Sequence, residues 1–292
     1  MKAHLFLIYI SSLFTSSAYT YAQTDNINIS TGSCIVSDVI HNDLKSALKD
    51  PEQVRHLNLS LNNLKKHSLN KLSHFKNLIS LDLSYNDIKI LPESILECTH
   101  LKKLNLSNNP IQSLPEEISK LLNLEELVMQ NTLIEGLPES LFDLNLKKLN
   151  FASKYSVITL SNNLLRLDSL EQLECSVSIQ EFHDIILKMD WINSLTIHVD
   201  SFVSPCSIIE VLTNIEKFNL VLDIYTTYEP VECSFKNLTK LHSFGIIYED
   251  CCWPYIDVSK EEFERIKSLL PHGCTLEGLI VKTGIKDTIE LR

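Results

Sequence analysis

The residues of this chain that could do chemistry are carboxylates, histidines and cysteines in its second half. Asp200, Asp223 and Glu249 end three successive apolar runs, and His198 stands two residues before the first of them. Stacked carboxylates could share a calcium ion, although aspartate also begins ordinary turns. A histidine near a carboxylate could move protons, although such a histidine is more often surface decoration. An enzymatic hypothesis would therefore have to rest on a polar cleft around His198, Asp200 and Asp223.

Other catalytic patterns are missing from the sequence. Two groups are loosely suggestive of catalysis, the pair His183-Asp184 and the cluster Cys251-Cys252-Trp253. Neither has a further side chain nearby in the sequence that would orient it for catalysis. The chain has no Gly-rich phosphate loop, no G-x-S-x-G, no H-E-x-x-H and no C-x-x-C pair. We therefore expect no enzyme, no cofactor and no metal site.

The elements that must position these residues come from a repeat of about 23 residues that begins at Val54. Three consecutive copies show it best: LISLDLSYNDIKILPESILECTH, LKKLNLSNNPIQSLPEEISKLLN and LEELVMQNTLIEGLPESLFDLN. Each unit is too short to bury its own apolar face, so units must stack and share one core. Strands are expected to start at Val54, Leu78, Leu101, Leu124, Leu146, Leu170, Ile192, Ile215, Leu241 and Leu276.

This pattern resembles the leucine-rich repeat family, in the subclass with L-P-x-x-I or L-P-x-x-L on the convex side. The matching elements are Leu91-Pro92 with Ile95, Leu114-Pro115 with Ile118, and Leu137-Pro138 with Leu141. The resemblance implies an α/β solenoid with a curved parallel β-sheet on its concave side and short helices or turns on its convex side. It also implies a ladder of inward asparagines at Asn62, Asn86 and Asn109, and a binding role in general.

The later units depart from this pattern. The ladder place becomes Thr132, Lys154, Ser178, Asp200, Asp223 and Glu249. Runs such as LTIHVD, FNLVLD and FGIIYE still predict strands, because they are rich in β-branched and aromatic residues. We therefore expect residues 54–150 to form regular leucine-rich repeats and residues 151–292 to form degenerate repeats with a C-terminal cap.

Helices are expected at both ends of the solenoid, where a terminal unit must cover its exposed neighbour. Residues 23–53 are the predicted N-terminal helical cap. Its helix begins at Ser37, places Ile40, Leu44, Ala47 and Leu48 on one face, and ends at Asp50-Pro51. Near the other end, Ser259-Lys260-Glu261-Glu262 fits a capping box for a helix that runs to about Leu270, before Pro271.

The N-terminus is typical of an export signal. Lys2 precedes the apolar stretch LFLIYISSLF, and small or polar residues follow as far as Ala22. The apolar stretch is shorter than the ~20 residues of a membrane span. Residues 1–22 are therefore the predicted signal peptide, with a signal anchor as the alternative. No membrane span is expected after signal removal, and the predicted location is secreted, periplasmic or at the cell surface.

The chain has eight cysteines. Cys98 and Cys175 fall on apolar places of the repeat and are expected to be packed thiols. Disulfides are plausible among the neighbouring late units, and reduced cysteines remain the alternative. The cysteines concerned are Cys206, Cys233, Cys251, Cys252 and Cys274.

Charged residues occupy the same two places on three successive strands of the expected concave face. They are Lys102-Lys103, Glu125-Glu126 and Lys147-Lys148. Parallel strands lie ~4.8 Å apart, so opposite charges can pair across the sheet. We interpret them as an ion-pair ladder that fixes the register, with a charged docking site as the alternative. The net charge of −11 and this alternation make nucleic acid an unexpected partner.

The best candidate for a binding site lies on the later strands. If the repeat register holds, Val177, Val199, Leu222 and Tyr248 form one outward column, with Val221 and Ile247 in the column beside it. Apolar side chains gathered on a polar sheet are typical of a protein contact. The alternative is that these residues are buried beneath loops or the C-terminal cap.

Three functional hypotheses follow from the sequence. The preferred one is an exported module that holds a protein partner on its concave strand face. The alternative is an intracellular scaffold or enzyme regulator of the same repeat class, which requires that residues 1–22 are retained. The third is an enzyme that uses the irregular second half. A repeat solenoid serves many partners, so the pattern does not identify the partner.

Overall fold

The computed structural model describes residues 39–64, 66–153, 158, 161–176, 185, 188–199, 212–223, 237–249, 267–270, 274–282 and 288–291. Its strands form one sheet in chain order, from β1 to β12. The strands are β1 Ile40–His41, β2 His56–Asn58, β3 Ser80–Asp82, β4 Lys103–Asn105, β5 Glu126–Val128, β6 Lys148–Asn150, β7 Gln172–Ser176, β8 Ser194–Val199, β9 Lys217–Asp223, β10 Ser243–Glu249, β11 Thr275–Lys282 and β12 Thr288–Leu291.

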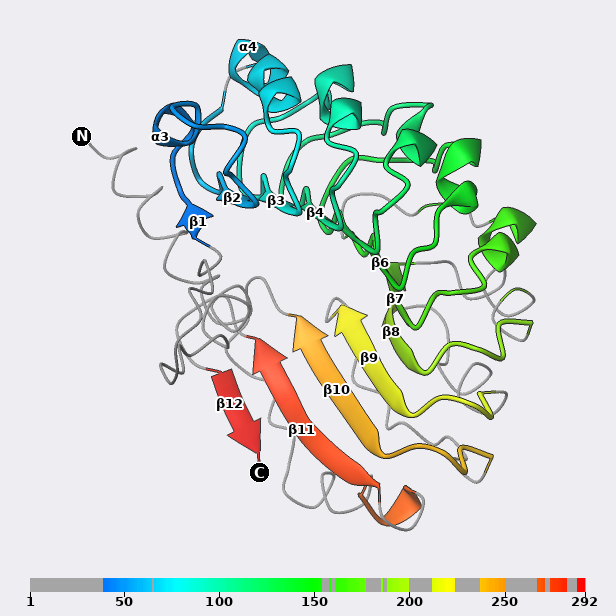
Figure 1. Cartoon of the computed structure of the whole chain (residues 1–292). Helices are drawn as coiled ribbons and strands as arrows, with labels where there is room; N and C mark the ends of the chain where they lie inside the picture. Colours follow the sequence, from blue (N-terminus) through cyan, green and yellow to red (C-terminus); the bar gives the residue numbers. More distant parts are fainter. Residues whose placement is uncertain are drawn as a thin grey trace, which may run out of the picture.

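Short helices alternate with the early strands. Two are α-helices, α3 Leu44–Ala47 and α4 Lys66–Leu69, and the others are 3₁₀-helices, η1 Asn70–His74, η2 Glu93–Glu97, η3 Ile118–Lys120, η4 Glu139–Asp143 and η5 Asn162–Arg166. Figure 1 shows the strands following one another along the inner side of a curved molecule, with these helices on the outer side. The expected α/β solenoid, with a concave parallel sheet and short convex helices, is confirmed.

The leucines of the repeat form one continuous core between the sheet and the convex turns. The fourth place of each early unit pairs with its neighbours in register, through Leu57, Leu81, Leu104, Leu127 and Leu149. None of these five side chains is more than 2% exposed. Burying a leucine side chain stabilises the fold by ~1.5–3 kcal/mol, so stacking supplies what a single unit lacks.

The L-P-x-x-I elements form the convex helices, as expected. Pro92 and Pro138 immediately precede η2 and η4, with extended backbones at ψ 148° and 145°. A proline fixes φ and has no N–H to leave unpaired at a helix start. The third residue after each proline then points into the core. These residues are Ile95, Ile118 and Leu141, and all are 0% exposed.

The asparagine ladder is confirmed at Asn86 and Asn109. The Asn109 Nδ2 group donates to the carbonyls of Leu106 and Ser107 in its own unit and, at 2.9 Å, to that of Leu83 in the preceding unit. Its Oδ1 accepts from the Ile88 N–H at 3.1 Å. Asn86 repeats this arrangement one unit earlier, with Leu59 and Leu64. A single side chain therefore satisfies backbone groups of two consecutive units.

The two ends of the ladder differ from its middle. Asn62, in the first unit, is exposed and donates to the carbonyl of Ser60. Thr132 occupies the next place after Asn109, is 3% exposed, and donates its hydroxyl to the carbonyl of Met129 at 3.0 Å. A threonine therefore keeps the bond within the unit where the asparagine pattern ends. Lys154, Ser178 and Asp200 lie outside the described residues.

The predicted N-terminal helix is too long. Ile40 is 52% exposed and belongs to β1, which pairs in parallel with β2. The helix α3 covers Leu44–Ala47, because the Asp43 side chain accepts from the N–H groups of Lys45 and Ser46 and begins it there. A strand next to the first unit can pair with its edge, which a helix cannot do. Ser37 lies outside the described residues.

The last unit also differs from the prediction. Leu276 pairs with Phe244, so it occupies the fourth place of its unit rather than the first. The expectation was wrong because the interval between Leu241 and Leu276 is longer than one repeat, so the period did not fix the register of the last strand. The register also shifts between Phe244 and Gly245, after this pair. Beyond β11, the strand β12 pairs antiparallel and forms the end of the sheet. Residues 267–269 are helical, as predicted, whereas the proposed capping box at 259–262 lies outside the described residues.

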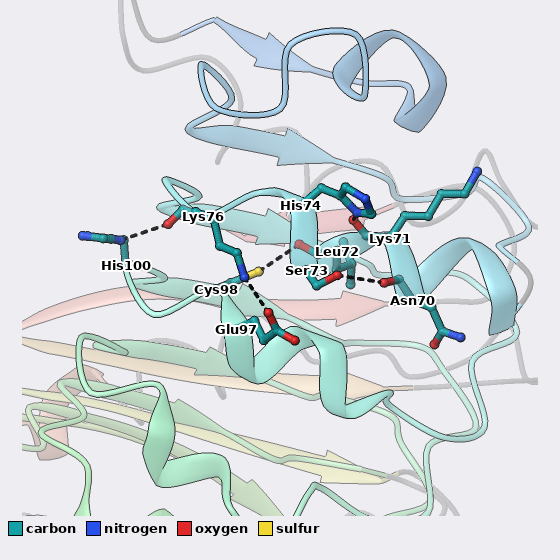
Figure 2. Close-up of polar contacts among 9 residues, drawn as sticks. All are labelled: Asn70, Lys71, Leu72, Ser73, His74, Lys76, Glu97, Cys98 and His100. Carbon is teal, nitrogen blue, oxygen red and sulfur yellow. Dashed lines mark hydrogen bonds and ion pairs between the residues drawn. The ribbon is translucent and has the colours of Figure 1, made fainter.

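Contacts between neighbouring units also stabilise the convex side (Figure 2). The Cys98 thiol donates to the carbonyl of Leu72 at 3.3 Å, one unit earlier. The His100 ring contacts the carbonyl of Lys76 at 2.9 Å, and the Lys76 ammonium pairs with Glu97 at 2.5 Å. The convex turns are therefore tied to one another by side chains, independently of the sheet.

Candidate protein-binding face

The inner face of strands β4–β6 carries the predicted ion-pair ladder. Glu125 contacts two lysines, Lys102 at 3.4 Å on one side and Lys147 at 2.9 Å on the other. In the neighbouring column, Lys103 contacts Glu126 at 2.8 Å. The prediction that charges of opposite sign pair across the sheet is confirmed.

The ionised forms of these side chains stabilise one another. The hydrogen bond from Lys147 lowers the pKa of Glu125 below its usual value, and Lys102 acts in the same direction. The same bond raises the pKa of Lys147. Both shifts favour the charged forms of Glu125 and Lys147.

Polar side chains at the ends of the early strands form hydrogen bonds with the backbone. In each case a side-chain oxygen accepts a hydrogen bond from the N–H group two residues later. The acceptors and donors are Asn58 and Ser60 at 3.0 Å, Asp82 and Ser84 at 2.8 Å, Asn105 and Ser107 at 3.1 Å, and Asn150 and Ala152 at 3.0 Å. Such bonds fix the turn that follows each strand. The acceptor oxygens are thereby used within the fold.

The register places most of the predicted apolar residues side by side on the later strands. Val199 pairs with Leu222, and Leu222 pairs with Tyr248. Val221 pairs with Ile247 in the adjacent position. Val221 is only 4% exposed, so its own side chain offers little surface in this structure.

The remaining members of this set are described less fully. Val177 lies outside the described residues, and for Val199, Leu222, Ile247 and Tyr248 the structure describes the backbone. Their adjacency in β8–β10 follows from the parallel pairing of these strands.

A polar group of which the sequence singled out only His198 lies across β7–β10. The His198 Nε2 atom is 3.0 Å from Glu174 Oε1, and their side chains are 15% and 29% exposed. Asn219 donates to the Thr196 hydroxyl at 3.2 Å. The Asn219 amide lies over Gly245, where a Cβ would stand 2.5 Å from its Oδ1. A larger residue at position 245 would therefore require the Asn219 side chain to move.

Among the described residues, His198 therefore contacts Glu174, a carboxylate that the sequence analysis did not consider. Glu174 and His198 are 24 residues apart, and this spacing, close to one repeat, could have identified the pair. Asp200 lies outside the described residues, and only the backbone of Asp223 and Glu249 is described. Among the described residues, no three His, Cys, Asp or Glu side chains gather as metal ligands.

The two cysteines expected to be packed thiols are confirmed as such. Cys98 and Cys175 are both 0% exposed. Burial raises the pKa of the Cys98 thiol to about 11 and that of Cys175 well above its usual value. Of the five late cysteines, Cys274 is partly buried against the core, and the other four lie outside the described residues.

Comparison with known proteins supports the architecture. The family model of the leucine-rich repeat region matches residues 53–260, well over half of the chain. None of the described helices is both long and apolar enough for a bilayer crossing. The comparison with curated protein sequences gives no match.

Two solved structures are among those similar to this chain. An internalin, InlF of Listeria monocytogenes, has 18% identity and a TM-score of 0.50, and the match covers 84% of this chain and 66% of the internalin. The chain therefore spans just under two thirds of that protein. A leucine-rich repeat protein of Leptospira interrogans has 20% identity and a TM-score of 0.34, with 82% and 84% of the two chains covered. At 18% identity the likeness to the internalin concerns the fold alone.

Proposed function

The chain belongs to the leucine-rich repeat family, and from this premise we propose that it is an exported, non-catalytic module that holds a protein partner on its concave strand face. The observation that supports this proposal is the continuous sheet of parallel neighbours from β1 to β11. Such a sheet presents side chains from many units on one rigid surface. A rigid surface loses little conformational entropy when a partner binds.

We place the partner contact on the later strands, at Val177, Val199, Val221, Leu222, Ile247 and Tyr248. Support comes from the register, which brings Val199, Leu222 and Tyr248 together. Because Val221 is 4% exposed, the proposed contact depends on the other five residues. A few residues clustered at the centre of an interface supply most of its binding free energy, and tyrosine is common among them.

Export defines the proposed layout of the chain. Residues 1–22 are a signal peptide that is removed, residues 23–53 cap the first unit, residues 54–150 form regular repeats, and residues 151–292 form degenerate repeats with a cap. The protein is then secreted, periplasmic or at the cell surface. Intact-mass analysis of the protein from its source cells tests this layout. A chain that begins at Gln23 supports export, whereas retention of Met1–Ala22 favours the alternative of an intracellular scaffold or enzyme regulator.

Partner capture tests the proposed contact. A variant with Val177→Glu, Leu222→Glu and Tyr248→Glu is compared with the parent protein by cross-linked capture from source-cell extract and medium. A matched control carries Ile90→Glu, Leu122→Glu and Leu133→Glu, which change residues that are 62%, 74% and 38% exposed elsewhere on the solenoid. Both variants are first checked for folding by circular dichroism.

The outcome is read from the difference between the two variants. We expect a partner that the parent and the control retain and that the late-strand variant loses. Equal capture by all three proteins would exclude the late strands as the contact. Equal loss in both variants would show that added charge, rather than position, decides capture.

A further inference from the structure

We propose that the inner face of β4–β6 is a second docking surface, which takes an acidic peptide segment of a partner protein. Six side chains form this lysine frame, from the first residue of each of three neighbouring strands and the residue just before it. They are Lys102, Lys103, Glu125, Glu126, Lys147 and Lys148. The lysine frame is separate from the late-strand contact, and its test does not depend on that contact.

The charge of the lysine frame opposes the charge of the chain. Four lysines and two glutamates give the frame a charge of 4 − 2 = +2, in a chain whose net charge is −11. On the β3 side, the neighbouring places are the uncharged Ile79 and Ser80. On the β7 side, they are Glu171 and Gln172, so an acidic residue marks that border. The excess of positive charge is therefore confined to three strands.

The lysines extend further into solvent than the glutamates between them. The side chains of Lys102, Lys103 and Lys147 are 51%, 52% and 53% exposed. Those of Glu125 and Glu126 are 35% and 25% exposed. A partner that approaches this face consequently meets ammonium groups before carboxylates.

The existing ion pairs do not block such a partner. Lys102 and Lys147 each contact one oxygen of the same Glu125 carboxylate. An ammonium group has three donors, so one carboxylate contact leaves donors for another acceptor. Exposed ion pairs contribute little to stability, and exchanging them for a partner's carboxylates costs little. The lysine frame also attracts an acidic segment before contact and so speeds association.

The arrangement fits a peptide better than a nucleic acid. Glu125 and Glu126 belong to the middle strand of the frame. Two lysines belong to the strand on each side of it, at the spacing of ~4.8 Å between strands. The continuous charge of a phosphate backbone would lie against these two carboxylates. Acidic side chains along a peptide can instead reach the lysines on either side.

Fluorescence anisotropy of a labelled octaglutamate peptide tests the proposal with the full chain at low salt. The test variant carries Lys102→Gln and Lys147→Gln. A matched control carries Lys71→Gln and Lys120→Gln, which remove the same charge from the convex helices η1 and η3. Folding of each protein is checked by circular dichroism and thermal unfolding, and a labelled octamer of thymidylate is the nucleic-acid probe.

We expect the parent and the convex control to bind the peptide alike and the test variant to bind about tenfold more weakly. Physiological salt should weaken the parent's binding, because the Debye length falls to ~8 Å. The proposal is overturned if the parent does not bind the peptide at low salt, or if both variants lose binding equally. Binding of the oligonucleotide as tightly as the peptide would overturn the assignment to an acidic peptide.

Discussion

Single residues satisfy the backbone where the chain turns between strand and convex segment. Asn109 is 2% exposed and bonds to backbone groups of two units. An apolar residue of similar size would leave these groups buried without partners, which costs ~1–3 kcal/mol for each of them. The fold therefore depends on a buried polar residue at this turn.

The first prediction concerns this residue. Asn109→Leu should lower the free energy of unfolding by about 3 kcal/mol or more, measured by urea unfolding. Asn62→Leu is the matched control, because Asn62 holds the same place of the repeat but is exposed and bonds within its own unit. A similar loss in both variants would contradict a special role for the buried ladder.

The place before the ladder has a left-handed backbone in four successive units. Leu61, Tyr85, Asn108 and Asn131 have φ values of 58°, 54°, 56° and 55°. Asparagine tolerates this conformation better than other side chains, whereas leucine is strained in it. Leu61 is 68% exposed, so few contacts offset its strain.

We therefore expect Leu61→Asn to stabilise the protein by about 0.5–1 kcal/mol, seen as a higher urea midpoint. The control is Ile90→Asn, since Ile90 is 62% exposed and does not have a positive φ. If Leu61→Asn has no effect or destabilises the protein, backbone strain at this place is not significant.

The thiol groups give a third prediction at this scale. With its pKa raised to about 11 by burial, Cys98 is a neutral thiol at pH 8, and the raised pKa of Cys175 has the same effect. The thiolate attacks iodoacetamide and displaces iodide, so both neutral thiols should escape alkylation in the folded protein and react in urea. Peptide mass spectrometry measures this, and rapid alkylation of either residue in the native state would contradict the burial.

The strands pair in register, and charges across them add to that pairing. Glu125 has a lowered pKa, so its stabilising effect is present above the pKa of the unfolded chain and is lost as pH falls through the folded pKa. Lys147 has a raised pKa, so its effect is present at neutral pH and is lost only as pH rises through the folded pKa. Exposed pairs contribute modestly, so both effects are small.

Glu125→Gln tests the acidic side of this argument. Thermal unfolding is followed as the pH is lowered past about 4.3, the ordinary glutamate value. The variant should lose less stability than the parent over this range, and added salt should reduce the difference. Identical pH profiles at low salt would show that the Glu125 pairs do not contribute to stability.

Much of the arrangement of elements could be predicted from the sequence. The period, the L-P-x-x-I elements and the alternating charges repeat at fixed places, so the core, the convex helices and the ladder of ion pairs followed from them. The repeat period did not predict β1 or the register shift after Phe244, because both depend on pairing with a neighbour that is distant in sequence. The Glu174–His198 pair could have been predicted from its spacing of 24 residues, but Asp200 is nearer to His198 in the sequence and was considered instead.

Part of the candidate site remains a prediction. Residues at the later strand ends were assigned to columns by counting from one unit to the next, and the register agrees with this counting for β8–β10. Exposure cannot be counted in this way, because it depends on what packs over each side chain. Val221 is an example, since counting along the repeat placed it in the predicted contact although it is only 4% exposed.

At the scale of the whole molecule, the solenoid separates two surfaces. The convex side is built from short helices tied to one another by contacts such as those from Cys98 and His100 (Figure 2). The concave side carries the lysine frame on β4–β6 and the proposed apolar contact on β8–β10. A partner long enough to span both would place an acidic segment on the early strands and apolar side chains on the later ones.

Hydrogen–deuterium exchange of the protein with and without its captured partner tests the concave face most directly. We predict slower exchange of backbone amides in strands β4–β10 when the partner is bound, with unchanged exchange in the convex helices η1–η5. Slower exchange confined to the convex helices, with the strands unaffected, would contradict a binding module that uses its concave face.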